Sequence, residues 1–278
     1  MHSRFLSRGQ LFGLLLLIVE VASPHPLTAL QADSRSHWPH PLERGKYQAR
    51  IASTGKVLWS VNWETRTRQK GSGTEVEVSE TGEGQPWRYK EPIRWEKKML
   101  FSEPQEASFL FDRVEGARWS SHGELLSHME VRMDPVTHRI SYRDSPAGKS
   151  TTPVSLPGTP QTLPDELLFH WARTLPFERA SQEPASTQFL LLISPKQRFR
   201  VEAKVQGQEV IRTPAGTFPC YRVNLVPQLI GPLRALAPRM VLWCQADPPH
   251  YWVRYQGPIG GPGSPEAVIE LVEFHSQE

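Results

Sequence analysis

Apolar and polar residues alternate along several stretches of this chain, with the two-residue period of a β-strand whose two faces differ. Residues 57–63 and 199–205 carry the clearest runs, and residues 129–133 and 140–142 repeat the pattern. Turn residues recur at short intervals, and the 26 prolines among 278 residues favour hairpins over long helices. The sequence therefore predicts a mainly β protein, built as a large antiparallel twisted sheet or an unclosed β-barrel.

One segment departs from the strand pattern. Its apolar residues recur at helical spacing over residues 167–175, Thr162 and Asp165 have the spacing of a weak capping box, and Pro176 marks the end. These signals predict one short helix packed on the sheet. The preceding residues are rich in Ser, Thr, Pro and Gly, so we expect a single β domain over residues 33–278 with a subdivision near residues 145–163 left open.

The last strand has a different composition. Residues 267–273 are apolar at nearly every position rather than at alternate ones. This pattern predicts a strand that is covered on both faces, by a short helix or a loop.

The first 32 residues have the layout of a secretory signal peptide. Arg4 and Arg8 precede an apolar run over residues 11–19, and small residues and prolines follow as far as Ala32. We expect a cleaved leader over residues 1–32 and an exported protein, with a retained N-terminal anchor as the alternative. No later stretch approaches the length of a membrane span. The net charge is only +3, with bases and acids interleaved, which gives no electrostatic footprint for nucleic acid.

The two cysteines lie in two strand-like runs. Cys220 falls in residues 217–225 and Cys244 in residues 240–245, with turn residues between the runs. An antiparallel hairpin would place the two cysteines roughly opposite one another, and an even number of cysteines in an exported chain favours a disulfide. The hypothesis is a Cys220–Cys244 disulfide, with two buried free thiols as the alternative.

The titratable residues form no recognisable catalytic or metal motif. The sequence contains no G-x-S-x-G elbow, His250 has no partner that the pattern identifies, and His37 and His40 are too few for a zinc site. We therefore expect no catalytic residues, no metal, no cofactor and no enzymatic activity.

Several motifs in the second half resemble a known family. They are Gly207, the run EVIRTPAGTF at residues 209–218, residues 221–223, Leu242–Trp243, and the run PPHYWVRY at residues 248–255. Over residues 163–274 the chain resembles a periplasmic family of Gram-negative bacteria known only as a domain of unknown function. That family is related in shape to the outer-membrane lipoprotein carriers, in which a helix lies as a lid over an unclosed barrel.

The turn at residues 214–216 has a physical basis that does not depend on the resemblance. Pro214 presets the first position of a turn, and Gly216 can adopt the positive φ that a type II turn needs. We therefore interpret Pro214 and Gly216 as structural turn residues.

The nine tryptophans leave two interpretations open. They fill a β core, or they contribute to a concave sheet face that holds a hydrophobic ligand such as a lipid or a lipoprotein acyl chain. The second hypothesis is a periplasmic protein that binds another envelope protein by a sheet face or edge, and the third and weakest is an enzyme acting on envelope polymers. The sequence does not determine the oligomeric state. In the ligand hypothesis the binding residues are Trp59, Trp63, Phe199, Val201, Leu167 and Trp171.

Overall fold

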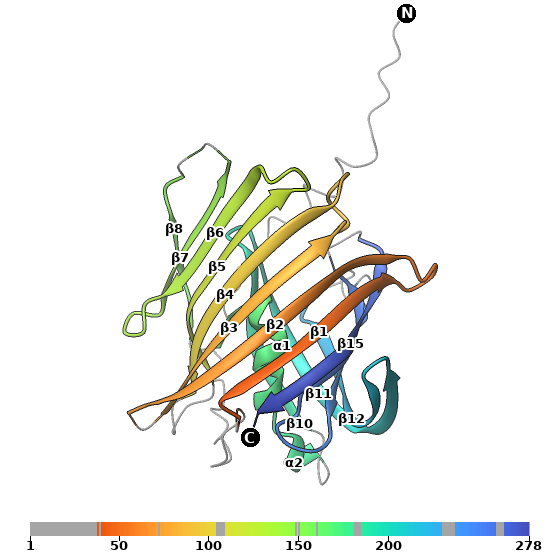
Figure 1. Ribbon diagram of the computed structural model, residues 1–278. Coiled ribbons are helices and arrows are strands. Elements are labelled where there is room, and N and C mark those ends of the chain that lie inside the picture. The colour runs from red at the N-terminus through yellow and green to blue at the C-terminus, as the bar shows by residue number, and fades with distance from the viewer. Residues whose placement is uncertain are drawn as a thin grey trace, which may run out of the picture.

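The computed structural model describes residues 38, 40–71, 73–103, 109–147, 149, 151–159, 161–180, 185–229, 237–259 and 264–277. The expected leader over residues 1–32 lies outside them. Fifteen strands form one sheet in the order β8-β7-β6-β5-β4-β3-β2-β1-β15-β14-β13-β12-β11-β10-β9, and all neighbours are antiparallel except β9 and β10. The mainly β, largely antiparallel prediction is confirmed (Figure 1).

The sheet divides into two walls that meet where β1 pairs with β15. The N-terminal wall contains β1 (Leu42–Ile51), β2 (Val57–Lys70), β3 (Gly73–Gly84), β4 (Ile93–Glu103), β5 (Leu110–Ser120), β6 (Leu125–Met133), β7 (Arg139–Pro146) and β8 (Val154–Pro157). The C-terminal wall contains β9 (Thr162–Pro164), β10 (Ala185–Ser194), β11 (Gln197–Thr213), β12 (Gly216–Pro227), β13 (Met240–Gln245), β14 (Trp252–Pro258) and β15 (Glu266–Gln277).

The connection between the two edge strands forces the sheet to curl. Laid flat, fifteen strands at their usual spacing would be roughly 65–70 Å across. However, β8 ends at Pro157 and β9 begins at Thr162, and the chain between them can span at most ~18 Å. The two edges are therefore held near one another without pairing, which makes the sheet an unclosed barrel. Both edge strands are short and flanked by prolines, which protects them from pairing with other chains.

The N-terminal wall shows the alternation that the sequence predicts. Inward residues such as Val61, Val131 and Ile140 are buried. The outward residues carry charge and pair across strands, as when Arg44 on β1 donates to Glu64 on β2 at 2.7 Å. Exposed pairs of this kind add little stability, but they keep the convex face in contact with water.

The predicted helix is present, in shorter pieces than its pattern implied. It consists of the 3-10 helix η1 (Asp165–Leu167), α1 (Leu168–Trp171), the 3-10 helix η2 (Ala172–Thr174) and, after Pro176, α2 (Phe177–Ala180). The predicted capping box is wrong, because Thr162 belongs to β9 and its hydroxyl accepts the backbone N–H of Thr159 at 2.8 Å. In Figure 1, α1 lies on the concave side of the sheet.

The distal part of the β11–β12 hairpin, residues 206–218, is here called the arm. An extra residue at the register shift between Val205 and Gln208 forms a bulge, and bulges bend strands. The arm curls away beside the label β12 in Figure 1 and packs on the convex face of the C-terminal wall. It forms a second, smaller core there, made by Ile211, Phe218, Cys220, Val241, Trp243 and Val253.

The turn of the arm lies against the last strand. Pro214 and Ala215 connect β11 to β12, and the N–H of Ala215 donates to the carbonyl oxygen of Leu271 at 3.4 Å. Gly216 follows as the first residue of β12, with a φ of +143°. The prediction that residues 267–273 are covered on both faces holds only in part. Residues 267 and 269–271 are buried, but Val268 and Val272 are half-buried and Glu273 is exposed. The arm, and not a helix or loop, lies against this strand.

The predicted Cys220–Cys244 disulfide is wrong. β12 and β13 do pair as the hairpin reasoning expects, but Tyr221, not Cys220, lies opposite Cys244. Neighbouring residues of a strand point to opposite faces, so Cys220 joins the smaller core and Cys244 the main core. Both are free, buried thiols. The register, which the sequence alone did not fix, separates them.

Candidate functional site

Residues 165–177, here called the internal segment, occupy the concave side of the sheet. Leu167 and Ala172 have no exposed surface, and Leu168 and Trp171 are buried. The ring of Trp171 lies 4.4 Å from that of Phe189 on β10, between centroids. In this structure the chain's own residues therefore fill the middle of the unclosed barrel.

A column of aromatic rings joins α1 to both walls. Phe169 stacks on Trp252 of β14 at 4.2 Å between centroids, and Trp252 stacks on Tyr47 of β1 at 3.6 Å. Tyr47 in turn stacks on Trp63 of β2 at 5.9 Å. The Tyr47 hydroxyl donates to the carbonyl oxygen of Trp252 at 2.9 Å, and burial raises the pKa of this hydroxyl well above its usual value. Stacked pairs contribute about 0.5–1.5 kcal/mol each beyond their burial, so the column helps to hold α1 against both walls.

A buried ion pair fixes the internal segment to the N-terminal wall. The Arg173 guanidinium donates to the Glu43 carboxylate at 2.8 Å, and both side chains are almost completely buried. Tyr251 donates a further hydrogen bond to Glu43 at 3.1 Å, and its ring lies 4.4 Å from the guanidinium carbon of Arg173. Removing one member of such a pair leaves an uncompensated buried charge, so this contact is a strong constraint on where the segment lies.

A second group of charges surrounds the start of the internal segment. Glu80 of β3 lies 3.8 Å from the Lys97 ammonium of β4 and 3.9 Å from Nε2 of His170. Burial by itself would raise the pKa of Glu80, but Lys97 and then His170 outweigh it and hold that pKa below its usual value. Burial, followed by the neighbouring Glu166, raises the pKa of Asp165 well above its usual value. The inner face is thus apolar in one part and charged in another.

The alternation pattern could have revealed these inward charges. Glu80 follows the buried Val78 by two residues, and Lys97 precedes the buried Met99 by two, so both lie on the inner face. Glu43 could not be found in this way, because the run that contains it, LERGKYQARI, shows no clear apolar period.

The six residues predicted to bind a ligand all lie in or against the main core. Trp63, Val201, Leu167 and Trp171 are buried, and Trp59 and Phe199 are partly buried and pack against that core. Trp59 alone among the six is in the lining of the pocket described next. The structure therefore brings the predicted residues to one interior, in which most of their surface is already covered.

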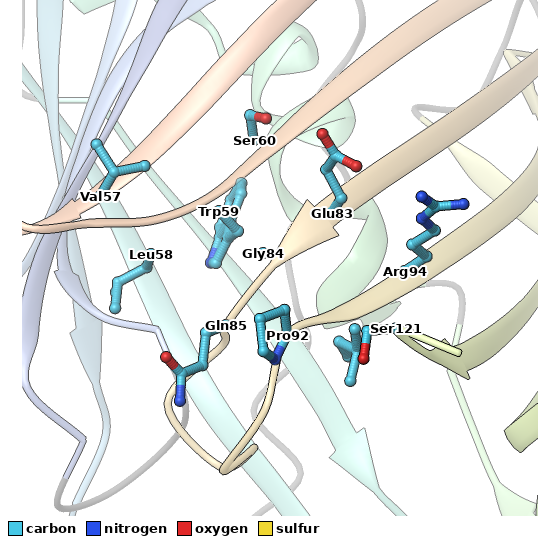
Figure 2. Close-up of a pocket in the computed structure, with 11 residues that line it drawn as sticks. Val57, Leu58, Trp59, Ser60, Glu83, Gly84, Gln85, Pro92, Arg94 and Ser121 are labelled. Atoms are coloured by element: carbon cyan, nitrogen blue, oxygen red, sulfur yellow. The ribbon is translucent and has the colours of Figure 1, made fainter. Parts of the chain in front are cut away.

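A pocket of about 460 Å³ opens at the rim of the N-terminal wall (Figure 2). The start of β2, the β3–β4 connection and the β5–β6 turn meet there, because Trp59, Gly84, Ile93 and Ser120 lie side by side in neighbouring strands. The lining combines apolar groups with a few polar ones. It consists of Val57, Leu58, Trp59, Ser60, Glu83, Gly84, Gln85, Pro92, Ile93, Arg94 and Ser121.

Glycines make room for tryptophans beside this pocket. A Cβ at Gly84 would lie 2.4 Å from the carbonyl oxygen of Leu58, and Gly84 has a φ of +142°. A Cβ at Gly82 would lie 2.2 Å from the indole of Trp95, whose ring meets Trp59 edge-on at 5.9 Å. The flat face of a tryptophan therefore covers the glycine opposite it, an arrangement that stabilises glycine positions in sheets. Single-residue patterns in the sequence did not identify these pairs.

Of the histidines weighed as candidate sites, His37 lies outside the described residues, and His250 has structural surroundings. His250, which has a φ of +58°, lies with Nδ1 3.0 Å from the carbonyl oxygen of Gln245 and packs on Phe177. Over the part of the chain that the structure describes, no group of three or more His, Cys, Asp or Glu side chains is placed to hold a metal ion. Within the same residues, no helix has the length and hydropathy needed to cross a membrane.

Solved structures from three bacteria match this chain. A β-barrel-like protein of the domain of unknown function DUF1849 from Brucella abortus matches with a TM-score of 0.51 and 9% identity, over 86% of this chain and 99% of that one. A candidate lipoprotein from Parabacteroides distasonis matches with a TM-score of 0.36 and 14% identity, over 87% and 100%. A candidate exported protein with a YmcC-like fold from Bacteroides fragilis matches with a TM-score of 0.33 and 12% identity, over 89% and 100%.

At these identities the likeness to the Brucella abortus protein concerns the fold alone. No curated protein matches the sequence. The sequence profile of a family described as "Protein of unknown function (DUF3108)" matches residues 120–270, which is more than half of the chain. That range begins in the N-terminal wall and contains the internal segment, the arm and most of the C-terminal wall. The resemblance to a domain of unknown function is confirmed, and the chain belongs to the DUF3108 family.

Proposed function

We propose that this protein is an exported, non-catalytic envelope protein that binds a hydrophobic ligand, such as a lipid or a lipoprotein acyl chain, at the rim pocket. The observation that carries the proposal is the pocket beside Trp59, which adjoins an interior lined with aromatic rings. The proposed ligand enters between the β3–β4 connection and the start of β2, where Leu58, Trp59 and Ile93 supply apolar contacts.

The size and lining of the pocket support a small apolar ligand. A volume of about 460 Å³ falls in the range of roughly 300–1,000 Å³ that is usual for ligand sites. Ser60, Glu83 and Arg94 line the same pocket from the convex side of their strands, and they are suited to a polar head group. The apolar end then lies against Trp59, and the polar end faces water.

The charged groups of the interior support a binding role over a catalytic one. Glu43 pairs with Arg173, and Glu80 lies between Lys97 and His170, so each pairing serves to position the internal segment. The proposed export rests on the leader pattern of residues 1–32 and places the protein in the periplasm. Cell fractionation of a tagged full-length chain tests that part, because a cytosolic protein with an intact leader would contradict it.

Binding of another protein by a sheet edge has less support. The two edge strands, β8 and β9, contain four and three residues and have prolines within or beside them. Such edges offer few free backbone groups for an added strand.

Ligand binding can be tested with a variant that fills the pocket. We expect the protein to bind dansyl-labelled undecanoic acid, with one site per chain, and native mass spectrometry of gently purified protein to detect a retained lipid. Ser121 lines the pocket and is exposed, so Ser121→Trp fills the site without entering the core. We expect this substitution to weaken probe binding at least about tenfold, which corresponds to ~1.4 kcal/mol.

A matched substitution provides the control. Ser141 is exposed on the convex face of β7, away from the pocket lining, so Ser141→Trp should bind the probe as the unmodified protein does. An unmodified protein that neither binds the probe nor retains lipid would rule out the proposal. Equal binding by both tryptophan variants would rule out the rim pocket as the site.

A further inference from the structure

The exposed apolar side chains of this protein gather at one rim. Among the described residues, six large apolar side chains are exposed, and four of them lie at the end of the N-terminal wall where the pocket opens. The other two are Val136, in the turn at the opposite rim, and Val210, on the arm. Isolated exposed apolar residues need no explanation, but their occurrence at one rim, beside a pocket, makes that rim the candidate interaction surface of this protein. The four are Val57, Trp87, Leu125 and Val154.

Basic side chains accompany these apolar residues. The rim loops are defined here as residues 52–57, 83–94, 120–125 and 151–154, together with Lys149. They carry five exposed basic side chains and three exposed carboxylates, an excess of positive charge in a chain that is otherwise close to balance. The basic residues are Lys56, Arg88, Lys90, Arg94 and Lys149, and the acidic residues are Glu83, Glu91 and Glu124.

The β3–β4 connection holds its aromatic residue outward in a defined turn. The side-chain amide of Gln85 donates to the carbonyl oxygens of Lys90 at 2.7 Å and Tyr89 at 3.3 Å. The backbone N–H of Tyr89 donates to the carbonyl oxygen of Pro86 at 2.9 Å. With the turn closed in this way, Trp87 remains 53% exposed, and the basic residues Arg88 and Lys90 follow it in the same turn. Tryptophan prefers the interface between lipid head groups and acyl chains, and lysine and arginine are attracted to anionic head groups.

We propose that the rim loops form a docking surface for an anionic phospholipid bilayer. Trp87 and Val57 enter the head-group region, and Lys90, Lys56 and Arg94 lie near the lipid phosphates. This orientation turns the mouth of the rim pocket toward the bilayer. The proposal goes beyond ligand binding, because docking needs only the exposed residues of the loops and does not require an occupied pocket.

Vesicle co-sedimentation tests the proposal. The full chain is mixed with vesicles of phosphatidylcholine alone, or of phosphatidylcholine and phosphatidylglycerol. We expect binding to the anionic vesicles that weakens as salt is added, because salt screens the attraction between surface charges. Lys90→Glu changes the local charge by two units and should lower the partition coefficient about tenfold or more. Trp87→Ala should lower the partition coefficient on anionic vesicles by a similar factor. Any binding to the neutral vesicles should fall by the same factor, because the contribution of Trp87 does not depend on lipid charge.

Matched variants separate the rim from the rest of the surface. Lys98→Glu makes the same charge change on the exposed convex face of β4, and Val136→Ala removes an exposed apolar residue at the opposite rim. Both should bind vesicles as the unmodified protein does. All four positions are exposed, and unchanged melting temperatures would show that the variants fold.

Three results would overturn docking on a bilayer. They are no binding to anionic vesicles, equal and salt-independent binding to both kinds of vesicle, and equal losses in the rim variants and their controls. The first result, together with capture of a folded protein that the rim variants lose, would identify the rim as a protein interface. Failure of the acyl probe to bind, with vesicle binding intact, would reject the proposed ligand and leave the docking surface standing.

Discussion

The two walls of the sheet bury their residues in different ways. The N-terminal wall is covered on its concave face only, and its convex face carries cross-strand charges such as Arg44 and Glu64. In the C-terminal wall the internal segment covers the concave face, and the arm covers the convex face over β13 and the adjoining parts of β12 and β14. The first part of β11 keeps a wet convex face, where Lys204 is exposed. In β13, Val241 and Trp243 belong to the outer core while Leu242 and Cys244 belong to the inner one.

This difference explains in which strands the sequence pattern identifies the residues that point inward. A strand with one wet face must alternate, so the N-terminal wall and the run at residues 199–205 of β11 show their register in their residue types. A strand with two buried faces is apolar throughout, and nothing in its composition identifies which residue points inward. The strand β13, which carries Cys244, is of this second kind, and the disulfide prediction failed there.

Removing one member of the buried ion pair between the internal segment and the N-terminal wall should have the largest effect. We expect Arg173→Met to reduce the free energy of unfolding by about 3–5 kcal/mol, because it leaves the Glu43 carboxylate buried and unpaired. Arg44→Met, which breaks the exposed pair with Glu64, should cost at most about 1 kcal/mol. Urea unfolding measures both, and the double variant Glu43→Gln/Arg173→Met should recover part of the loss. A similar loss in the free energy of unfolding for Arg173→Met and Arg44→Met would contradict the contrast between inner and outer charges.

Two neighbouring residues of β11 test the second core under the arm. Ile211 is 5% exposed and packs in that core, whereas Val210 is 67% exposed. We expect Ile211→Ala to cost about 2–5 kcal/mol and Val210→Ala to change stability by less than about 0.5 kcal/mol. Thermal and urea unfolding compare them directly. An arm that moves freely in solution would make the two variants equivalent.

Acid should weaken the charged part of the concave face. The pKa of Glu80 is lower in the folded protein than its usual value of 4.5, so its contribution to stability is complete above pH 4.5 and is lost as the pH falls through the folded-state pKa. Glu80→Gln should therefore lower the melting temperature at pH 7 and flatten its decline below pH 4.5. Glu77→Gln on the convex face of β3 is the control, and an unchanged pH profile in Glu80→Gln would remove this role for the carboxylate.

The two thiols should show the smallest effect of all. We expect dithiothreitol to leave the melting temperature unchanged, because Cys220 and Cys244 lie in different cores and are free. Burial raises the pKa of Cys220 to about 12 and raises that of Cys244 further, so neither thiol should react with Ellman's reagent in the native state. Both should react after denaturation. An intact mass that is lower before reduction than after it, by the mass of two hydrogens, would show that the disulfide forms and would contradict this expectation.

The candidate site could be predicted only in part. Alternation identified Trp59 as an inward aromatic residue, and Trp59 does line the rim pocket. The other lining residues come from the start of β2, from the β3–β4 connection with the strand ends that flank it, and from the β5–β6 turn. Their meeting depends on strand register and on Gly84, whose missing side chain lets β2 and β3 approach. Trp63 and Trp171, also predicted to contact a ligand, instead pack against the protein's own aromatic rings.

The sequence by itself determined the strand period, the position of the short helix and the family. Each depends on local features, which are side-chain alternation, helical spacing and motifs of a few residues. Such features can be recognised in the sequence without knowing which distant residues are in contact. Only the tertiary structure decided that the helix fills the barrel, that the arm covers the last strands and that the cysteines lie on opposite faces. These outcomes depend on contacts such as Arg173 with Glu43, 130 residues apart, and on a one-residue register that reverses the direction of every side chain in a strand.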